Sequence, residues 1–331
     1  MGNFKYTNKY GVSLALAVFL MYDSYDHDSR DNVISATGII KPLRQLILMQ
    51  QNPDTAKEVD ISDLVASRMG SAIHDGCQQA WEDKDNVNQA LIALGASPTS
   101  IERVVVNPAE GSVKEGQIPV YVEQRHEKVV DNYIITGKFD IVLDGTVNDY
   151  KSTSVWGYIY DSNADSYTKQ GSIYRWLTPD KIHSDYININ YIFTDWSATK
   201  AKQDPKAYPQ QRVLTKKYPI WSESATDEWI RNKLDMLVQH LQSPQEMIPE
   251  CTKEELWASD AVFKYYKDPS KKTRSTKNFS TMDEALIKKS QDGDVGEIVE
   301  VPGEVKACRY CPVVSICTQA EGMLTDGRLI L

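Results

Sequence analysis

Residues 135–142 read Ile-Thr-Gly-Lys-Phe-Asp-Ile-Val, and residues 146–151 read Thr-Val-Asn-Asp-Tyr-Lys. Both segments are strand candidates, and a turn that contains Asp and Gly separates them. Asp140 ends or interrupts the first strand, and in an antiparallel hairpin this order brings Asp140 and Asp149 close enough to share a cation. Asp149 and Lys151 are two residues apart, so their side chains point to the same face of their strand.

These three side chains suit the hydrolysis of a phosphodiester bond. Two carboxylates can hold Mg²⁺ or Mn²⁺, and the metal polarises the phosphate and lowers the pKa of its bound water. The lysine then positions or deprotonates that water. Two solvated acids beside a turn would give the same pattern, so the hairpin alone leaves both interpretations open.

Further motifs flank the hairpin in a fixed order. His74 lies on the helix predicted before the strands, and Gly137 and Asp140 form a G-x-x-D motif. Gln170 and Tyr174 form a Q-x-x-x-Y motif and share one face of the helix predicted after the strands. Over about residues 60–200, this series resembles the RecB-type nucleases of the PD-(D/E)XK superfamily.

The resemblance implies an α/β fold with a restriction-endonuclease-like core, in which helices flank a central mixed sheet. It implies a divalent cation held by one imidazole, two carboxylates and a backbone carbonyl, from His74, Asp140, Asp149 and Tyr150. Lys151 would be the catalytic lysine, and Gln170 and Tyr174 would contact DNA or support the site. Glu123, on the preceding strand, matches an acid often present in the family and is a candidate outer ligand.

A second candidate site lies near the C-terminus. Cys308, Cys311 and Cys317 form a C-x2-C-x5-C pattern, and thiolates packed so closely commonly bind a metal. The pattern resembles the C-terminal segment of the iron–sulfur nucleases in the same superfamily, which implies a [4Fe–4S] cluster. In those relatives the fourth cysteine precedes the nuclease core, but Lys41 stands at the comparable place here. Cys251 is the preferred fourth ligand and Cys77 the other candidate, and Zn²⁺ stays open as the alternative metal.

The rest of the sequence suggests three parts: a helical N-terminal region (1–60), the nuclease core (61–245) and a metal-binding C-terminal module (246–331). Apolar periodicity predicts a buried helix over 12–21 and helices over 35–48, 62–82, 164–177, 226–241 and 281–289. Alternating or β-rich segments predict strands over 104–106, 120–123, 133–143, 147–151 and 186–193.

The composition is that of a globular protein, with 331 residues of which 41% are hydrophobic and 25% are charged. The net charge of −9 excludes a protein that coats DNA by bulk charge, but not local basic patches such as residues 264–277. The five cysteines, an odd number, favour metal ligation in a reducing compartment over a disulfide framework. No segment is long enough to span a membrane, and we expect a cytoplasmic protein.

The expected function is therefore a Mg²⁺- or Mn²⁺-dependent DNA nuclease, with an exonuclease favoured over an endonuclease. Its partner is DNA with an end, and a recombination protein or a second copy of the chain is a further candidate partner. A stand-alone nuclease of the kind that bacteriophages encode, acting in the host cytoplasm, fits the resemblance. The alternative is a non-catalytic DNA-binding or assembly protein that retains the fold, and the complete set of Asp140, Asp149 and Lys151 weighs against it.

Overall fold

The computed structural model describes residues 3–23, 28, 30 and 32–331 of the chain. It divides into two compact units. The core unit contains Tyr6–Lys41 and Glu58–Asp235, and the cysteine unit contains Pro42–Lys57 and Met236–Leu331 together with the N-terminal residues up to Lys5. Residues 42–57, which the sequence suggested as part of an N-terminal region, thus group with the C-terminal residues.

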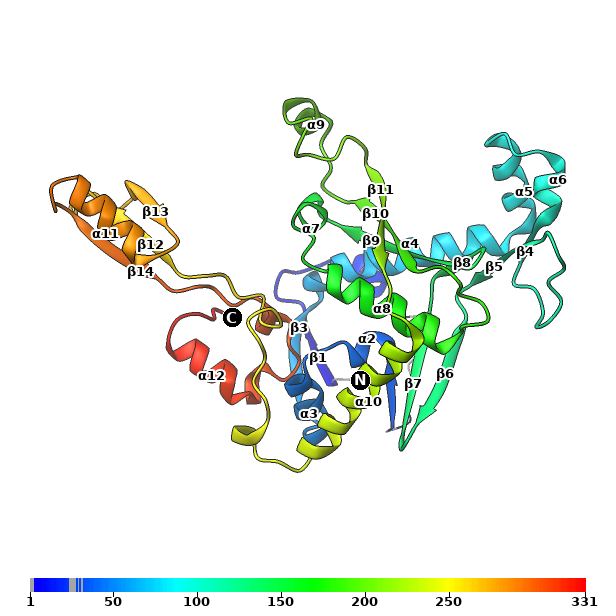
Figure 1. Ribbon diagram of the computed structural model, residues 1–331, viewed down its shortest axis with the longest axis horizontal. Coiled ribbons are helices and arrows are strands. Elements are labelled where there is room, and N and C mark those ends of the chain that lie inside the picture. Colours follow the sequence, from blue (N-terminus) through cyan, green and yellow to red (C-terminus); the bar gives the residue numbers. More distant parts are fainter. Residues whose placement is uncertain (1–2, 24–27, 29, 31) are drawn as a thin grey trace. The chain divides into compact units, whose positions relative to one another are not determined.

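The centre of the core unit is a mixed six-stranded sheet in the order β11-β10-β9-β8-β5-β4 (Figure 1). Its strands are β4 (Val104–Val106), β5 (Ile118–Val122), β8 (Ile141–Leu143), β9 (Thr146–Thr153), β10 (Tyr186–Phe193) and β11 (Val213–Pro219). β9 runs parallel to β10 and β4 parallel to β5, and the other pairs are antiparallel. The predicted hairpin is confirmed, because Ile141 on β8 pairs with Asn148 on β9.

A second, three-stranded sheet places one of the predicted acids. It consists of β2 (Val33–Ser35), β6 (Arg125–Val130) and β7 (Tyr133–Lys138), with β7 in the middle. The strand predicted over 133–143 is interrupted at Asp140, as expected: β7 ends at Lys138 and β8 starts at Ile141. The prediction needs correction in one respect, because the two parts belong to different sheets. The buried Phe139 anchors the break, and Asp140 lies where the chain crosses from one sheet to the other.

Two helices of the core unit, α4 (Val65–Glu82) and α8 (Ala164–Leu177), pack against the six-stranded sheet near β9. The other helices of this unit are α1 (Leu14–Met21), α2 (Ala36–Ile39), α5 (Lys84–Ala93), α6 (Pro98–Arg103), α7 (Val155–Tyr160), α9 (Ala198–Gln203) and most of α10 (Glu223–His240). The ring of Tyr150 lies against His74 of α4, whereas Asp149 contacts Gln170 of α8. Neighbouring residues of a strand face opposite sides, so α4 and α8 lie on opposite faces of β9.

Two helix predictions need correction. The helix predicted over 35–48 is broken into α2 and α3 (Leu43–Gln51), because Pro42 lacks an amide hydrogen and clashes with the preceding turn. Ser35 does cap α2, through a hydrogen bond from the Gly38 amide. The helix predicted over 12–21 forms as α1 but is not buried: Leu20 is enclosed, whereas Leu14 is 80% exposed.

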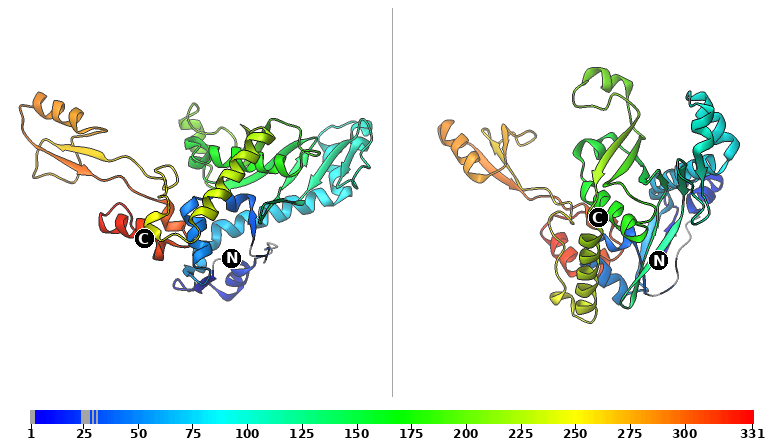
Figure 2. Two further views of the ribbon diagram at one scale, coloured as in Figure 1. Left: turned by 60° about the horizontal axis from the view of Figure 1, so that its bottom comes forward. Right: turned by 45° about the vertical axis from the view of Figure 1, so that its right-hand side comes forward.

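The cysteine unit contains a small arm and a compact base. In the arm, β12 (Val262–Tyr266) lies between β13 (Lys277–Phe279) and β14 (Glu297–Val301), and α11 (Met282–Gln291) packs along this sheet (Figure 2). Thr281 caps α11, because its side chain accepts a hydrogen bond from the Glu284 amide. The base contains α3, α12 (Thr318–Thr325) and three short 3-10 turns at Gln245–Met247, Ala307–Tyr310 and Val314–Ile316.

A separate two-stranded sheet pairs β1 (Asn3–Thr7) with β3 (Ala56–Asp60), and a 3-10 turn (Ile61–Leu64) leads into α4. Among the residues that the structure describes, none of the helices has both the length and the apolar character needed to cross a bilayer.

Candidate functional site

The core unit brings together three side chains with ligand atoms suited to a metal. His74 comes from the middle of α4, Glu123 directly follows β5, and Asp140 lies between β7 and β8. One nitrogen or oxygen atom from each lies within 4.8 Å of the others. His74 lies 49 positions before Glu123 and 66 before Asp140 in the sequence, so only the tertiary fold can bring the three together.

His74 lies between two of the other predicted ligand atoms. Its Nδ1 is 3.2 Å from Asp140 Oδ2, and its Nε2 is 3.0 Å from the carbonyl oxygen of Tyr150. The hydrogen bond with Asp140 raises the pKa of His74, although burial opposes this shift. Three of the four ligands that the resemblance implied, His74, Asp140 and the Tyr150 carbonyl, are therefore in mutual contact.

Asp140 is fixed by the hairpin that follows it. Its Oδ2 accepts a hydrogen bond of 2.8 Å from the backbone amide of Tyr150, and the Asp140 carbonyl accepts one of 2.9 Å from the Glu123 amide. The residue is only 9% exposed. The carboxylate is thus held at the meeting point of β5, β8 and β9 before any ligand arrives.

Glu123 belongs to the tight group, although the sequence suggested it only as an outer ligand. Its backbone φ is +51°, an uncommon conformation for a residue with a side chain, and such strain often marks a functional position. Its carboxylate forms an ion pair of 2.6 Å with Lys138. Burial raises the pKa of Glu123, although the Lys138 interaction opposes the shift.

Asp149 lies beside this group and is the most enclosed of the acids, with 1% of its surface exposed. Gln170 donates a 2.9 Å hydrogen bond to its Oδ1, and Lys151 forms an ion pair with its Oδ2. Burial raises the pKa of Asp149 to about 6, against the Lys151 charge that lowers it. The buried carboxylate is therefore compensated by the Lys151 ammonium at Oδ2 and by the Gln170 amide at Oδ1.

Lys151 lies next to Asp149, as its position two residues along the strand predicts. Burial lowers the pKa of Lys151, but the charges of Asp149 and Asp140 outweigh burial and raise it overall. The ammonium group therefore stays charged at neutral pH. Its side chain is 28% exposed, so it can still reach a bound substrate.

Gln170 and Tyr174, both on α8, form hydrogen bonds that hold the acids of the site in place. Besides Asp149, Gln170 Nε2 contacts the Tyr174 hydroxyl at 2.9 Å, and that hydroxyl donates to the Lys138 carbonyl at 2.9 Å. Both side chains are buried, so of the two roles that the resemblance allowed, their position fits support rather than DNA contact. Gly137 makes room for this packing, because a Cβ there would lie 3.1 Å from the Tyr174 ring and 2.7 Å from Leu177.

The cysteine unit holds the second candidate site. Cys308 is part of a small apolar core, and Cys251 and Cys317 pack against it. Burial raises the pKa of Cys251 to about 12, with further contributions from Glu255 and from the thiols of Cys317, Cys308 and Cys311. Burial likewise raises the pKa of Cys308 to about 11, with contributions from Cys311 and Cys317. Cys251, Cys308 and Cys317 therefore share one small core, and Cys311 lies three residues after Cys308 in the chain.

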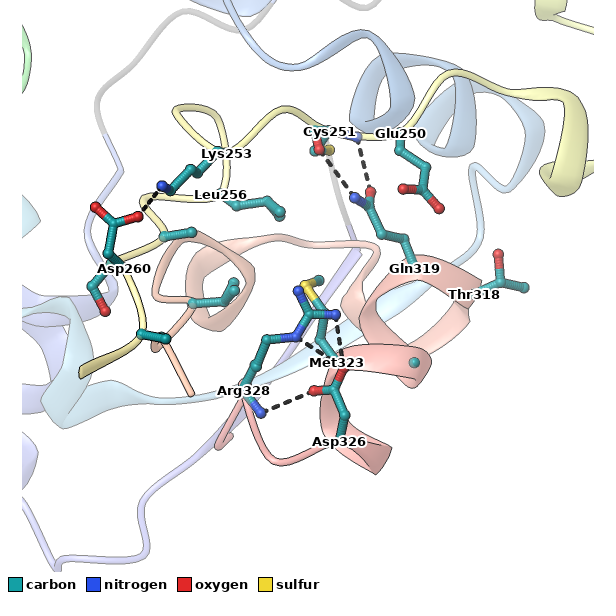
Figure 3. Close-up of a pocket in the computed structure, with 16 residues that line it drawn as sticks. Glu250, Cys251, Lys253, Leu256, Asp260, Thr318, Gln319, Met323, Asp326 and Arg328 are labelled. Atoms are coloured by element: carbon teal, nitrogen blue, oxygen red, sulfur yellow. Dashed lines mark hydrogen bonds and ion pairs between the residues drawn. The ribbon is translucent and has the colours of Figure 1, made fainter. Parts of the chain in front are cut away.

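Cys77, the other candidate for the fourth ligand, belongs to the core unit and lies on α4. Burial raises its pKa, and its thiol interacts with Tyr150. Cys251 is instead clasped by Gln319 of α12, which accepts a 2.9 Å hydrogen bond from the Cys251 amide and donates one of 3.0 Å to its carbonyl (Figure 3). Beside it, a cavity of about 610 Å³ opens between the loop around Leu256 and α12.

Comparison with known proteins adds little to this geometry. No family model matches the sequence, and no curated protein matches it. Two chains among the solved structures match this one. One is a phage-related exonuclease from Haemophilus somnus 129PT, which is 11% identical with a TM-score of 0.35, over 63% of this chain and 92% of that one. A TM-score this low does not establish a shared fold, so the case for a function rests on the residues of the site.

Proposed function

We propose that the chain is a divalent-metal-dependent deoxyribonuclease with a PD-(D/E)XK-type core that degrades DNA from an end. The observation that carries the proposal is the convergence of His74, Glu123 and Asp140, whose ligand atoms lie within 4.8 Å of one another, next to the Asp149–Lys151 ion pair. A protein that only binds DNA has no need to combine a metal-ligand group with a buried acid and a charged lysine.

The donor set fits the proposed metal. Carboxylate and carbonyl oxygens with one imidazole suit Mg²⁺ or Mn²⁺, and the ligands would be His74, Glu123, Asp140 and the Tyr150 carbonyl, with Asp149 beside them. When bound, such an ion polarises the phosphate and lowers the pKa of a coordinated water. Lys151, fixed by Asp149, would orient that water and offset the charge that develops on the phosphate. Gln170 and Tyr174 would keep Asp149 in place.

The test is a cleavage assay with two DNA forms. Purified protein is incubated with end-labelled linear DNA and with closed circular DNA, in Mg²⁺, Mn²⁺ or EDTA. We expect loss of the linear DNA with either metal, intact circles and no reaction in EDTA. Nicked circles would indicate an endonuclease, and a complete lack of cleavage would favour a non-catalytic DNA-binding protein.

Asp149→Asn is expected to remove cleavage and to weaken binding of the divalent cation, because the variant loses the most enclosed carboxylate beside the metal group. At a Mn²⁺ concentration of 100 times its Kd, binding stabilises a protein by about 2.7 kcal/mol. A tenfold rise in Kd would remove about 1.4 kcal/mol of this gain. Thermal unfolding of wild type and variant across a Mn²⁺ titration measures the difference, and equal shifts would exclude Asp149 from the metal site.

Glu123→Gln tests whether Glu123 is a metal ligand, as its place beside His74 and Asp140 suggests, or only an outer residue, as the motifs implied. Since Glu123 lies in the tight group, we expect this variant to weaken Mn²⁺ binding at least as much as Asp149→Asn does. Glu127→Gln is the matched control, because Glu127 is an acid on the neighbouring strand β6 that pairs with Arg30. If the Mn²⁺ titrations of Glu123→Gln and the control coincide, Glu123 is not a ligand.

We also propose that Cys251, Cys308, Cys311 and Cys317 bind a metal, as a [4Fe–4S] cluster or as Zn²⁺. Cys251, Cys308 and Cys317 share one small apolar core, and burial there raises the pKa of Cys251 and of Cys308. Metal binding would offset this cost, because a cation stabilises the thiolate form of its ligands. The site belongs to a different unit from Asp140 and Lys151, so we assign it a structural role.

A further inference from the structure

Arg44 is a buried cation in the base of the cysteine unit. It lies in the first turn of α3 and is 3% exposed. Its Nε donates a hydrogen bond of 3.3 Å to the sulfur of Cys317. The remaining contacts are to neutral oxygens: Nη1 to the carbonyls of Gln245 (3.1 Å) and Ile248 (2.9 Å), and Nη2 to Gln245 Oε1 (3.4 Å) and Thr318 Oγ1 (2.8 Å).

No carboxylate accompanies this guanidinium. Of the acidic residues in the described part of the chain, none forms an ion pair with Arg44, and burying an arginine without a counter-ion is costly. Its place on α3 makes the cost larger, because the N-terminal end of a helix disfavours a positive charge. Of all the groups that contact Arg44, the Cys317 sulfur is the one that can carry a negative charge.

The surroundings of Cys317 favour a negative charge there as well. Cys317 is the N-cap residue of α12, and the N-terminal end of a helix stabilises an anion. The same sulfur belongs to the four-cysteine group, and a metal bound by four thiolates carries a net negative charge, whether it is Zn²⁺ or a [4Fe–4S] cluster. The arginine and the cysteine group therefore complement each other.

We infer that Arg44 is the counter-ion of the metal group bound by Cys251, Cys308, Cys311 and Cys317. This inference rests on the metal site proposed above. Arg44 is a positioning residue: it holds Cys317 through the Nε hydrogen bond and offsets the charge of the thiolates, while its Nη groups tie α3 to the residues before Cys251 and to α12. It also explains why residues 42–57 belong to the same unit as the C-terminal cysteines.

The test compares three variants of the full chain, purified without oxygen. Arg44→Met removes the charge and all five hydrogen bonds, Arg44→Lys keeps the charge, and Thr318→Val removes one neutral partner. The measurements are iron and zinc per chain, the rate at which a chelator extracts the metal, and the unfolding temperature. We expect Arg44→Met to lose metal roughly 10- to 100-fold faster than wild type, Arg44→Lys to lie close to wild type, and Thr318→Val to lower the unfolding temperature without changing the extraction rate.

The outcomes distinguish a counter-ion of the metal from a structural latch, that is, an arginine that only stabilises the fold through its hydrogen bonds. If the latch is the whole role, extraction follows the unfolding temperature in all three variants, and Arg44→Lys and Arg44→Met lose metal equally fast; that result overturns the inference. If Arg44→Met does not fold, Arg44→Gln against Arg44→Lys makes the same comparison. Should the site hold iron, Arg44→Gln should also lower the reduction potential of the cluster, because a nearby positive charge favours the added electron.

The wild-type protein distinguishes failure of the inference from failure of its premise. Well-folded wild type with neither iron nor zinc would exclude the metal site, and the counter-ion role with it. Wild type that contains metal, together with an Arg44→Met variant that keeps it as firmly, would leave the metal site in place and exclude the role of Arg44.

Discussion

Lys151→Ala is expected to abolish DNA cleavage while DNA binding and folding persist. The lysine is charged and lies beside Asp149, next to the proposed Mg²⁺ or Mn²⁺ site. It is therefore placed to orient the attacking water and to stabilise negative charge on the phosphate. Loss of such a group lowers a rate by roughly 10²- to 10⁴-fold. Because the side chain is part-exposed, we expect its removal to cost the fold little. Single-turnover cleavage of end-labelled DNA in Mg²⁺ measures the rate, and anisotropy in Ca²⁺ measures binding.

Lys169→Ala is the matched control for this variant. Lys169 is another lysine of the core unit that pairs with an aspartate, Asp165 on α8, but it does not belong to the metal group. We expect its cleavage rate to stay close to wild type. A Lys151→Ala protein that cuts DNA at nearly the wild-type rate would show that the active site has been assigned to the wrong residues.

The parts of this site that follow from the sequence are those set by local geometry. The β8–β9 hairpin depends on a short turn, and the contact of Lys151 with Asp149 follows from the two-residue repeat of a strand. The contact of Gln170 with Tyr174 follows from the four-residue spacing on a helix. Each of these relations involves residues close together in the chain, and all three are present in the structure.

The rest depends on long-range packing that no local pattern encodes. Glu123 lies beside His74 and Asp140 for two reasons: its own backbone is in the left-handed conformation directly after β5, and Asp140 lies where the chain crosses between two sheets. Neither feature can be read from hydrophobic periodicity. The only hint was the acid's position on the strand before Gly137. The sequence indicated an interruption of the strand at Asp140, but it carries no signal that β7 and β8 belong to different sheets.

Arg44 shows a similar limit in the cysteine unit. Lys41 stands where the resemblance leads one to expect the fourth cysteine ligand. The sequence alone therefore gives no reason to place this segment beside the C-terminal thiols. In the structure the connection is present, because Arg44, three residues later, contacts Cys317. Pro42 breaks the expected helix just before Arg44 and starts α3 afresh. A buried arginine looks like a surface one in a single sequence, so this residue could not be identified without the fold.

The fold of the cysteine unit makes its stability sensitive to its thiols. Its base has a small apolar core of six buried residues: Leu256, Val305, Cys308, Ala320, Met323 and Leu329. The arm between Cys251 and Cys308 includes the exposed basic segment 267–274, which adds no apolar surface to that core. A core this small supplies little stability by itself, so a bound metal would contribute much of the folding free energy of the unit.

Cys308→Ser and Cys311→Ser are therefore expected to lower the unfolding temperature of the cysteine unit by about 10 °C or more, given a metal contribution of several kcal/mol. Cys77→Ser is the control: that thiol is half-buried on α4 in the core unit, and its loss should cost about 1 kcal/mol. Calorimetry can follow the two units as separate transitions. Anaerobically purified wild type should be brown, absorbing near roughly 400 nm, if the thiolates bind an iron–sulfur cluster, and colourless with one zinc if they bind Zn²⁺. Serine variants as stable as Cys77→Ser would mean that these thiols bind no structural metal.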